Sequence, residues 1–230
     1  MFRTLAAQPG WNILEFDDLW PEASALAFDR HPGCSLAQWT SAACPVLTLV
    51  AGEPFAHVPS RQQRKLRMAR NRAQRGAPVE FCRADAASSP SFLQWLIRLH
   101  GERWHSRGQT GVLSDERVRS FHQQSLPALV QSELARLYAL RVGEEIAAVY
   151  YGFQHRTRAY CYLSGFDPKF SFISPGVLLL AHVMSESAST GVSEIHFLRG
   201  DERYKYLWGA VPRFNMHREF RRGGAADQGS

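Results

Sequence analysis

The sequence has 230 residues, of which 45% are hydrophobic and 21% are charged. This composition predicts one large domain, or a domain plus part of a second, and it excludes a globally disordered chain. The net charge of +6 comes from one segment, because residues 61–75 contain seven basic residues and no acid, which leaves 20 basic against 21 acidic residues elsewhere.

No uncharged apolar run approaches the ~18–20 residues of a membrane-spanning helix. Glu15, Asp17 and Asp18 interrupt the N-terminal segment early, so it lacks the basic-then-apolar pattern of a secretory signal. These features predict a soluble, cytoplasmic protein. The four cysteines show no CxxC spacing, so we expect neither a disulfide framework nor a metal site.

The segment before residue 60 holds two short strand patterns. They cover residues 11–16 and 45–50, and Pro45 and Gly52 bracket the second one. The polar residues between the two patterns have a helical appearance.

The basic segment 61–75 predicts a mostly exposed helix with a thin apolar stripe. Ser60 and Gln63 form a capping-box pattern at its start, and Gly76 marks its end. Its cations could meet RNA phosphates, but no aromatic residues are interleaved for base stacking. A solvated linker helix is the favoured interpretation.

Beyond residue 77 the pattern changes to alternating strands and helices. Residues 78–84 predict a strand, and a helix should run from Ser89 to about Arg107. A second helix should begin near Ser114, with Pro127 as a kink or break.

Three strand patterns follow at residues 134–142, 145–153 and 159–166, and their short links predict an antiparallel meander. A helix at 175–190 and a strand at 192–198 complete a strand–helix–strand crossover. The sequence therefore predicts an α+β fold with a mixed sheet.

The link between the last meander strand and the following helix is a candidate anion site. Ser164, Gly165, Ser174 and Gly176 are small, and a helix N-terminus offers free backbone N–H groups. An ordinary Ser-Pro-Gly helix start explains the same residues equally well.

The segment HFLRGDERYKYLWG, residues 196–209, follows the crossover strand and should face the same crevice. Its basic residues could hold anionic groups, and its acidic residues and tyrosines could transfer protons. For any single residue, a solvated loop side chain is the alternative. The candidates are Arg199, Asp201, Glu202, Arg203, Tyr204, Lys205 and Tyr206.

Three motifs resemble the GNAT-like acetyltransferases of the BioF2-like or CelD-type group, which are relatives of the FemAB aminoacyl transferases. They are HGERWHSRG (100–108), YLSGFDPKF with SPGVLLLAHVM (162–184), and IHFLRGDERYKYLWGA (195–210). The resemblance covers about residues 61–220. It implies a GNAT fold and transfer of an acyl group from acetyl-CoA or another acyl-CoA to an amine or hydroxyl of a small-molecule or saccharide acceptor, often in polysaccharide or cell-envelope synthesis.

The resemblance also implies roles for the candidate residues. Ser164 and Gly165 would meet pantetheine, and Ser174 and Gly176 would meet the pyrophosphate. The proton-transfer and acceptor side would comprise Asp201, Glu202, Tyr204 and Lys205, with Arg199, Arg203 and Trp104 as substrate-binding residues. No metal is implied.

The chain departs from the family pattern at Pro175, which removes one backbone donor, and at His196, where the family carries an acid. The family has two tandem GNAT-like halves, so the expected organisation is a partial half at 1–60, a basic linker helix at 61–76, an acyltransferase domain at 77–222 and a disordered tail at 223–230. Two rival functions stay open: a FemAB-like transferase that uses aminoacyl-tRNA and contacts it through the basic helix, and a shortened, non-catalytic binding module.

Overall fold

The computed structural model describes residues 4, 7–28, 33–105 and 108–223, with the backbone alone at 103–105. The chain forms two compact units. The smaller unit comprises Met1–Pro45, Arg199–Asp201 and Pro212–Ser230, and the larger comprises Val46–Leu198 and Glu202–Val211. Residues 224–230 of the expected tail at 223–230, and the expected helix end near Arg107, lie outside the described residues.

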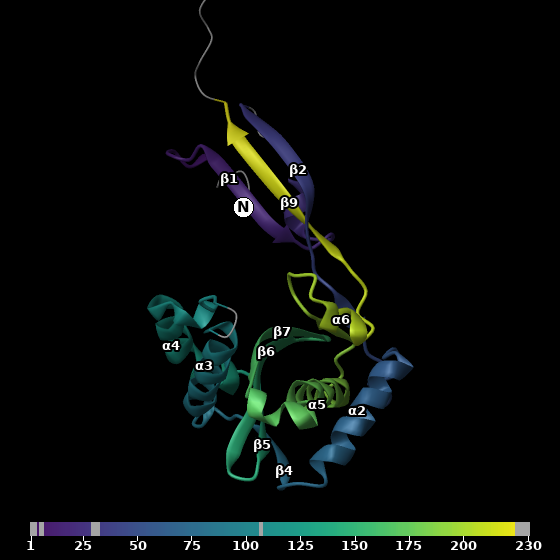
Figure 1. Ribbon diagram of the computed structural model, residues 1–230. Coiled ribbons are helices and arrows are strands. Elements are labelled where there is room, and N and C mark those ends of the chain that lie inside the picture. Colours follow the sequence, from purple (N-terminus) through teal and green to yellow (C-terminus); the bar gives the residue numbers. More distant parts are fainter. Residues whose placement is uncertain (1–3, 5–6, 29–32, 106–107, 224–230) are drawn as a thin grey trace, which may run out of the picture. The chain divides into compact units, whose positions relative to one another are not determined.

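The larger unit is built on a six-stranded sheet with the order β3-β8-β7-β6-β5-β4 (Figure 1). All neighbouring strands are antiparallel except β7 and β8, which are parallel. The strands are β3 (Val46–Thr48), β4 (Val79–Arg83), β5 (Ala135–Val142), β6 (Glu145–His155), β7 (Arg158–Phe166) and β8 (Glu194–His196). This arrangement confirms the expected meander and crossover in an α+β fold.

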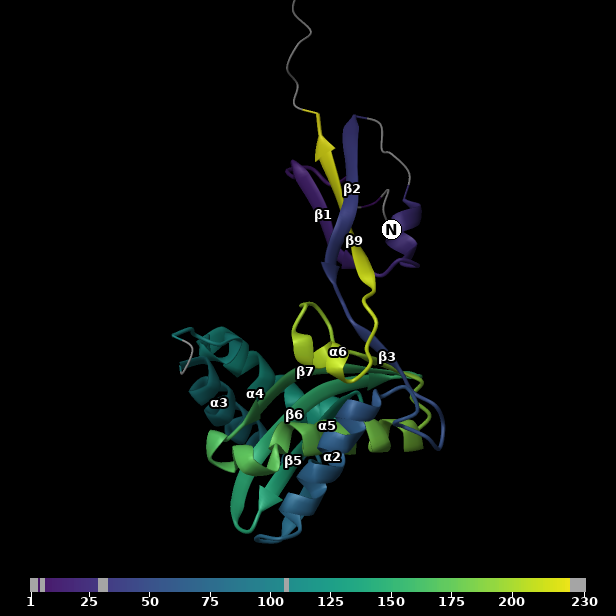
Figure 2. The same ribbon diagram turned by 45° about the vertical axis from the view of Figure 1, so that its right-hand side comes forward.

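Helices cover both faces of this sheet, as Figures 1 and 2 show. The helices α3 and α4 pack on one face, and α2 and α5 on the other, each around its own buried apolar cluster. The helices are α2 (Ser60–Ala73), α3 (Ser89–His105), α4 (Glu116–Gln131), α5 (Pro175–Ser189) and α6 (Arg203–Leu207), with 3₁₀ turns η1 (Ser24–Ala27), η2 (Val112–Ser114) and η3 (Pro168–Ile173). No helix of the described residues combines the length and apolar character needed to cross a membrane.

Alternation along the central strands explains why both faces are covered. In β6, Tyr150 belongs to the cluster under α2 and α5, whereas Val149 and Tyr151 belong to the cluster under α3 and α4. Successive strand side chains point to opposite faces, so an almost continuous apolar run requires a helical layer on each side.

The parallel pair β7 and β8 separates along its length. Residues Arg158–Tyr160 pair with Glu194–His196, and β7 then continues to Phe166 with β6 as its only strand partner among the described residues. One edge of β7 is therefore open from Cys161 onward, and its backbone groups face the gap between the two strands.

The smaller unit is a three-stranded antiparallel sheet with the order β1-β9-β2. Its strands are β1 (Ile13–Leu19), β2 (Cys34–Ala43) and β9 (Phe214–Arg222). The helical interpretation of the segment between the first two strand patterns is wrong for Cys34–Ala43, which forms β2, whereas Ser24–Ala27 forms a 3₁₀ turn. Pairing with β9, nearly two hundred residues away, decides this structure.

Two local expectations are corrected. Helix α2 begins at Ser60, but its N-cap is Pro59 and no side chain caps it. The amide of Gln63 instead donates to the carbonyl oxygens of Phe55 and Val58, at 3.2 and 2.9 Å. Helix α4 continues through Pro127 without a break.

Candidate functional site

A cavity of about 410 Å³ lies in the larger unit where β7 and β8 separate. Its walls come from β6, β7, the start of α5, α6 and α2. Among the residues that line it are Gln62, Lys65, Tyr150, Cys161, Ser164, Gly165, Ser174, Pro175, Gly176, Phe197, Tyr204 and Trp208. Of the candidate residues named from the sequence, Ser164, Gly165, Ser174, Gly176 and Tyr204 line this one cavity.

The first turn of α5 presents backbone donors to this cavity. Ser174 adopts a left-handed conformation at φ 54° as the N-cap and makes no side-chain cap. Pro175 has no N–H, and the N–H of Val177 donates to the Ser174 carbonyl at 2.9 Å. Within the described residues, Gly176 therefore supplies the open N–H of this turn, next to the positive end of the helix dipole.

The two glycines of the site have different structural reasons. A Cβ on Gly165 would lie 2.8 Å from the His100 backbone nitrogen and 2.9 Å from the Leu99 carbonyl carbon, so glycine allows β7 to approach α3. A Cβ on Gly176 would find Phe166 at 3.9 Å, which is ordinary contact. Close helix packing therefore accounts for Gly165, whereas the surface of Gly176 is open to a ligand.

Two polar side chains lie deep in the cavity. The Tyr150 hydroxyl is 3.6 Å from the Cys161 sulfur. Burial raises the pKa of the Cys161 thiol to about 12 and the pKa of Tyr150 well above its ordinary value. Both groups are therefore protonated near neutral pH, the Tyr150 hydroxyl also donates to the Tyr160 carbonyl at 3.4 Å, and Cys161 offers the cavity a thiol rather than a thiolate nucleophile.

Helix α6 carries the predicted proton-transfer residues of the larger unit. Tyr204 lines the cavity and is 43% exposed, with its ring edge-on to Phe197. Lys205 is only 2% exposed; its ammonium donates to the Leu198 carbonyl at 3.1 Å and lies 2.7 Å from the Glu202 carboxylate. Through this hydrogen bond to Leu198, Lys205 holds α6 against the segment that follows β8.

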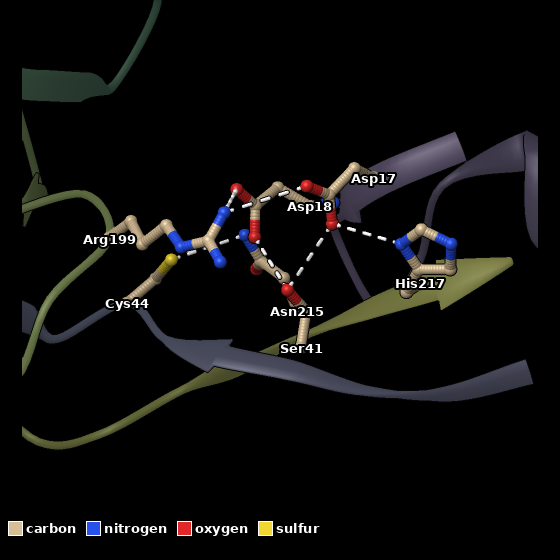
Figure 3. Close-up of polar contacts among 7 residues, drawn as sticks. All are labelled: Asp17, Asp18, Ser41, Cys44, Arg199, Asn215 and His217. Carbon is tan, nitrogen blue, oxygen red and sulfur yellow. Dashed lines mark hydrogen bonds and ion pairs between the residues drawn. The ribbon is translucent and has the colours of Figure 1, made fainter. Parts of the chain in front are cut away.

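Arg199 and Asp201 belong to the smaller unit. There the Arg199 guanidinium lies 3.5 Å from the Asp17 carboxylate and 3.6 Å from that of Asp18 (Figure 3). The ring of His217 donates to Asp17 across 3.1 Å, and this hydrogen bond is the main reason that the pKa of Asp17 is lowered. Arg199 thus joins an ion-pair cluster on the three-stranded sheet.

The remaining predicted residues are dispersed. Arg203 and Glu202 are exposed at the start of α6, and Trp104 lies in α3, where its side chain is outside the described residues. His196 is 5% exposed, lies 3.1 Å from the Glu194 carboxylate and packs against the Tyr160 ring, which is a structural position in β8.

The sequence interpretation missed other lining residues, among them Gln62, Lys65, Tyr150 and Cys161. One signal was available for Gln62, since it extends the apolar helical stripe of α2 by one turn, with Leu66 next in line. Tyr150 and Cys161 carry no such signal. The sequence pattern of a buried strand predicts that its side chains alternate between the two faces of the sheet, but not which of them face a cavity.

Comparisons with known proteins agree with this architecture. The model of the acetyltransferase (GNAT) domain family matches residues 60–206, which is more than half of the chain. The curated proteins give no match. Among solved structures, the chain is similar to FemX, at 12% identity and a TM-score of 0.68, over 94% of this chain and 74% of that chain.

The chain is also similar to two further solved structures, each at 14% identity. Each match covers 83% of this chain and 63% of the other chain. They are L-PGS from Bacillus licheniformis, with a TM-score of 0.55, and a conserved protein of unknown function from Bacteroides thetaiotaomicron VPI-5482, with a TM-score of 0.56. The chain thus spans less than two thirds of both, and identities this low show a shared fold alone. The family match over α2 to α6, together with the divergent β7–β8 pair, shows that the chain belongs to the GNAT acetyltransferase domain family, whose general chemistry is acyl transfer.

Proposed function

We propose that this protein transfers an acyl group from an acyl-CoA donor to an amine or hydroxyl acceptor. The cavity at the opening between β7 and β8 carries the proposal, because it combines an unpaired strand edge with an open helix N-terminus. The edge of β7 at Ser164 can pair with the amides of pantetheine, and the Gly176 N–H can meet the pyrophosphate. We also propose that the protein belongs to the BioF2-like or CelD-type group and acts in polysaccharide or cell-envelope synthesis. The sequence motifs alone support these two statements.

The reaction requires two proton movements. The acceptor nitrogen or oxygen forms a bond to the acyl carbon and loses a proton, while the carbon–sulfur bond breaks and the thiolate gains one. Tyr204 lines the cavity with an exposed ring, so we assign its hydroxyl as the donor to the leaving sulfur. Direct transfer fits better than an acyl-enzyme, because the Cys161 thiol is protonated.

Thiol release from acetyl-CoA, followed against a panel of amines and sugars, tests this function. Wild type should turn over with at least one acceptor class, and Tyr204→Phe should lower kcat by about 10²-fold or more if it is the general acid. If acetyl-CoA binds but no acceptor supports turnover, the chain is a non-catalytic binding module, and the transferase proposal fails.

A second candidate is transfer from an aminoacyl-tRNA. Arg64, Arg67 and Arg70 are exposed on α2 and have no acidic partner within the described residues. This candidate predicts tRNA binding that weakens steeply with salt and is lost in the triple variant Arg64→Ala, Arg67→Ala, Arg70→Ala. Arg117→Ala, which removes an exposed charge from α4, is the control. If wild type, the triple variant and this control bind tRNA with equal affinity in a gel-shift titration, this candidate is contradicted.

The domain organisation is likewise a proposal. We infer that residues 1–60 contribute a partial GNAT-like half, that 61–76 form a linker helix and that 77–222 form the acyltransferase domain. The pairing of β9 with β1 and β2 supports a shared sheet for the N-terminal and C-terminal segments.

A further inference from the structure

The basic helix α2 forms a second wall of the cavity, apart from β7 and α5. Gln62 and Lys65 both line the cavity and lie one helical turn apart. Residues at this spacing share a helix face, so the two side chains reach the cavity together. Helices α2 and α5 pack side by side, as both ribbon views show.

Gln62 is the observation that distinguishes this wall. It is only 5% exposed, and its side-chain amide has no hydrogen-bond partner within the described part of the chain. Its neighbours on the same buried stripe, Leu66 and Ala69, are apolar. Its amide atoms are not among the fully buried side-chain atoms without a partner, so they stay accessible from the cavity. A largely buried polar side chain of this kind is usually satisfied by water or by a bound molecule, and its place at the cavity wall suits a ligand atom.

Lys65 adds the charge. Among the described residues that line the cavity, Lys65 is the one charged side chain, and it has no ion pair with an acid. Residues 61–75 contain no acid that could neutralise it locally. The first turn of α5 lines the same cavity with the open Gly176 N–H. An ammonium, an amide donor and a helix N-terminus all favour negatively charged oxygen atoms.

We propose that Gln62 and Lys65 bind a phosphate group of the ligand from the α2 side, while the first turn of α5 binds it from the other. This inference rests on the proposed donor site and deepens it, since it makes α2 the element that selects a phosphate-bearing donor. Helix α5 alone offers one backbone donor and a partial charge, whereas Lys65 supplies a full positive charge.

Calorimetric titration with acetyl-CoA, and separately with inorganic pyrophosphate, tests the role of Lys65. Lys65→Ala should weaken both by about tenfold at low ionic strength, and the loss should shrink at high ionic strength because salt screens the charge. Arg61→Ala is the matched control. It removes one exposed charge from the same helix, one turn before Lys65 and outside the cavity lining, and should change either affinity by less than about twofold.

Gln62 is tested by two substitutions of similar size. Gln62→Leu should weaken acetyl-CoA binding several-fold at any ionic strength, because it removes the amide donor. Gln62→Glu should weaken it further at low ionic strength, because a carboxylate repels phosphate. Thermal unfolding of both variants separates a binding loss from a folding loss, and Lys65→Ala keeps the test decisive if either variant fails to fold.

The outcomes separate this inference from the proposed function. If wild type binds acetyl-CoA and Lys65→Ala binds it as tightly as Arg61→Ala does, the phosphate-binding role of α2 is wrong and the donor site stands. If wild type binds pyrophosphate through Lys65 but does not bind acetyl-CoA, the phosphate site stands and the donor identity is wrong. Absence of binding to both ligands overturns both proposals.

Discussion

Gly165 and Gly176 look equivalent in the sequence, yet the structure requires glycine only at the first. A side chain at Gly165 would collide with the backbone of α3 near Leu99, and backbone cannot rotate away as a side chain can. Gly176 has room for a methyl group. The sequence suggested two phosphate-binding glycines, and only contact geometry separates the packing residue from the open one.

Substitution of the two glycines by alanine should therefore differ in effect. Gly165→Ala should lower the free energy of unfolding by about 1–3 kcal/mol, because the added methyl forces β7 away from α3. Gly176→Ala is the matched control and should change stability by less than about 1 kcal/mol. Urea unfolding measures both, and equal losses would contradict the packing explanation.

The Cys161 thiol should be slow to react. Burial raises its pKa to about 12, so very little of it is the reactive thiolate near neutral pH. Iodoacetamide followed by peptide mass spectrometry should modify the half-buried Cys34 and Cys82 well before Cys161. Rapid alkylation of Cys161 would contradict the protonated thiol and would favour a mechanism through a covalent acyl-enzyme.

At the scale of elements, Lys205 fixes the short helix α6 to the end of β8. Its ammonium satisfies the Leu198 carbonyl from a position that is almost fully buried. A helix of one turn has little stability of its own, so its position depends on such contacts. Tyr204, the proposed general acid, precedes Lys205 in α6, so the contacts of Lys205 also determine where Tyr204 lies.

Lys205→Met should therefore destabilise the protein by about 1–3 kcal/mol, because it leaves a carbonyl without its donor. Glu202→Gln should cost less than about 1 kcal/mol, since that carboxylate is largely exposed. Chemical denaturation distinguishes the two effects. If Lys205→Met keeps wild-type stability while turnover disappears, the catalytic role implied by the family resemblance is the better account.

The elements that the sequence predicted well are those with a strong local pattern. Helix α2, helix α5 and the meander of β5, β6 and β7 follow from periodicity and turn residues. Strands β2 and β9 do not, because their partners lie at opposite ends of the chain and no local pattern encodes that pairing. The site shows the same division. Ser174 and Gly176 could be predicted because they form a recognisable helix start, whereas nothing in the sequence distinguishes Tyr150 from the other tyrosines of the buried strands.

Across the whole molecule, one buried and one half-buried histidine on the two faces of the six-stranded sheet link stability to pH. The buried His122 of α4 contacts Tyr151 and Tyr162, and the half-buried His182 of α5 stacks on Phe81. Burial lowers the pKa of both rings below their ordinary value of 6.5, although nearby Glu186 opposes the shift at His182.

The unfolded chain therefore binds more protons than the folded protein as pH falls below about 6.5, and stability should decline there. Urea unfolding from pH 8 to pH 5 should show this decline, and the double variant His122→Gln, His182→Gln should show a shallower one. An unchanged slope in that variant would assign the pH dependence to other groups.

The central claim is that an acyl-CoA binds where β7 and β8 separate, against the first turn of α5. Calorimetric titration of acetyl-CoA into wild type and Gly176→Trp tests it most directly, with Gly176→Ala as the control for folding. We predict saturable binding by wild type and by Gly176→Ala, and a loss of about tenfold or more in Gly176→Trp, whose indole would fill the cavity. Equal affinity for all three proteins, or no binding by wild type, would contradict the account.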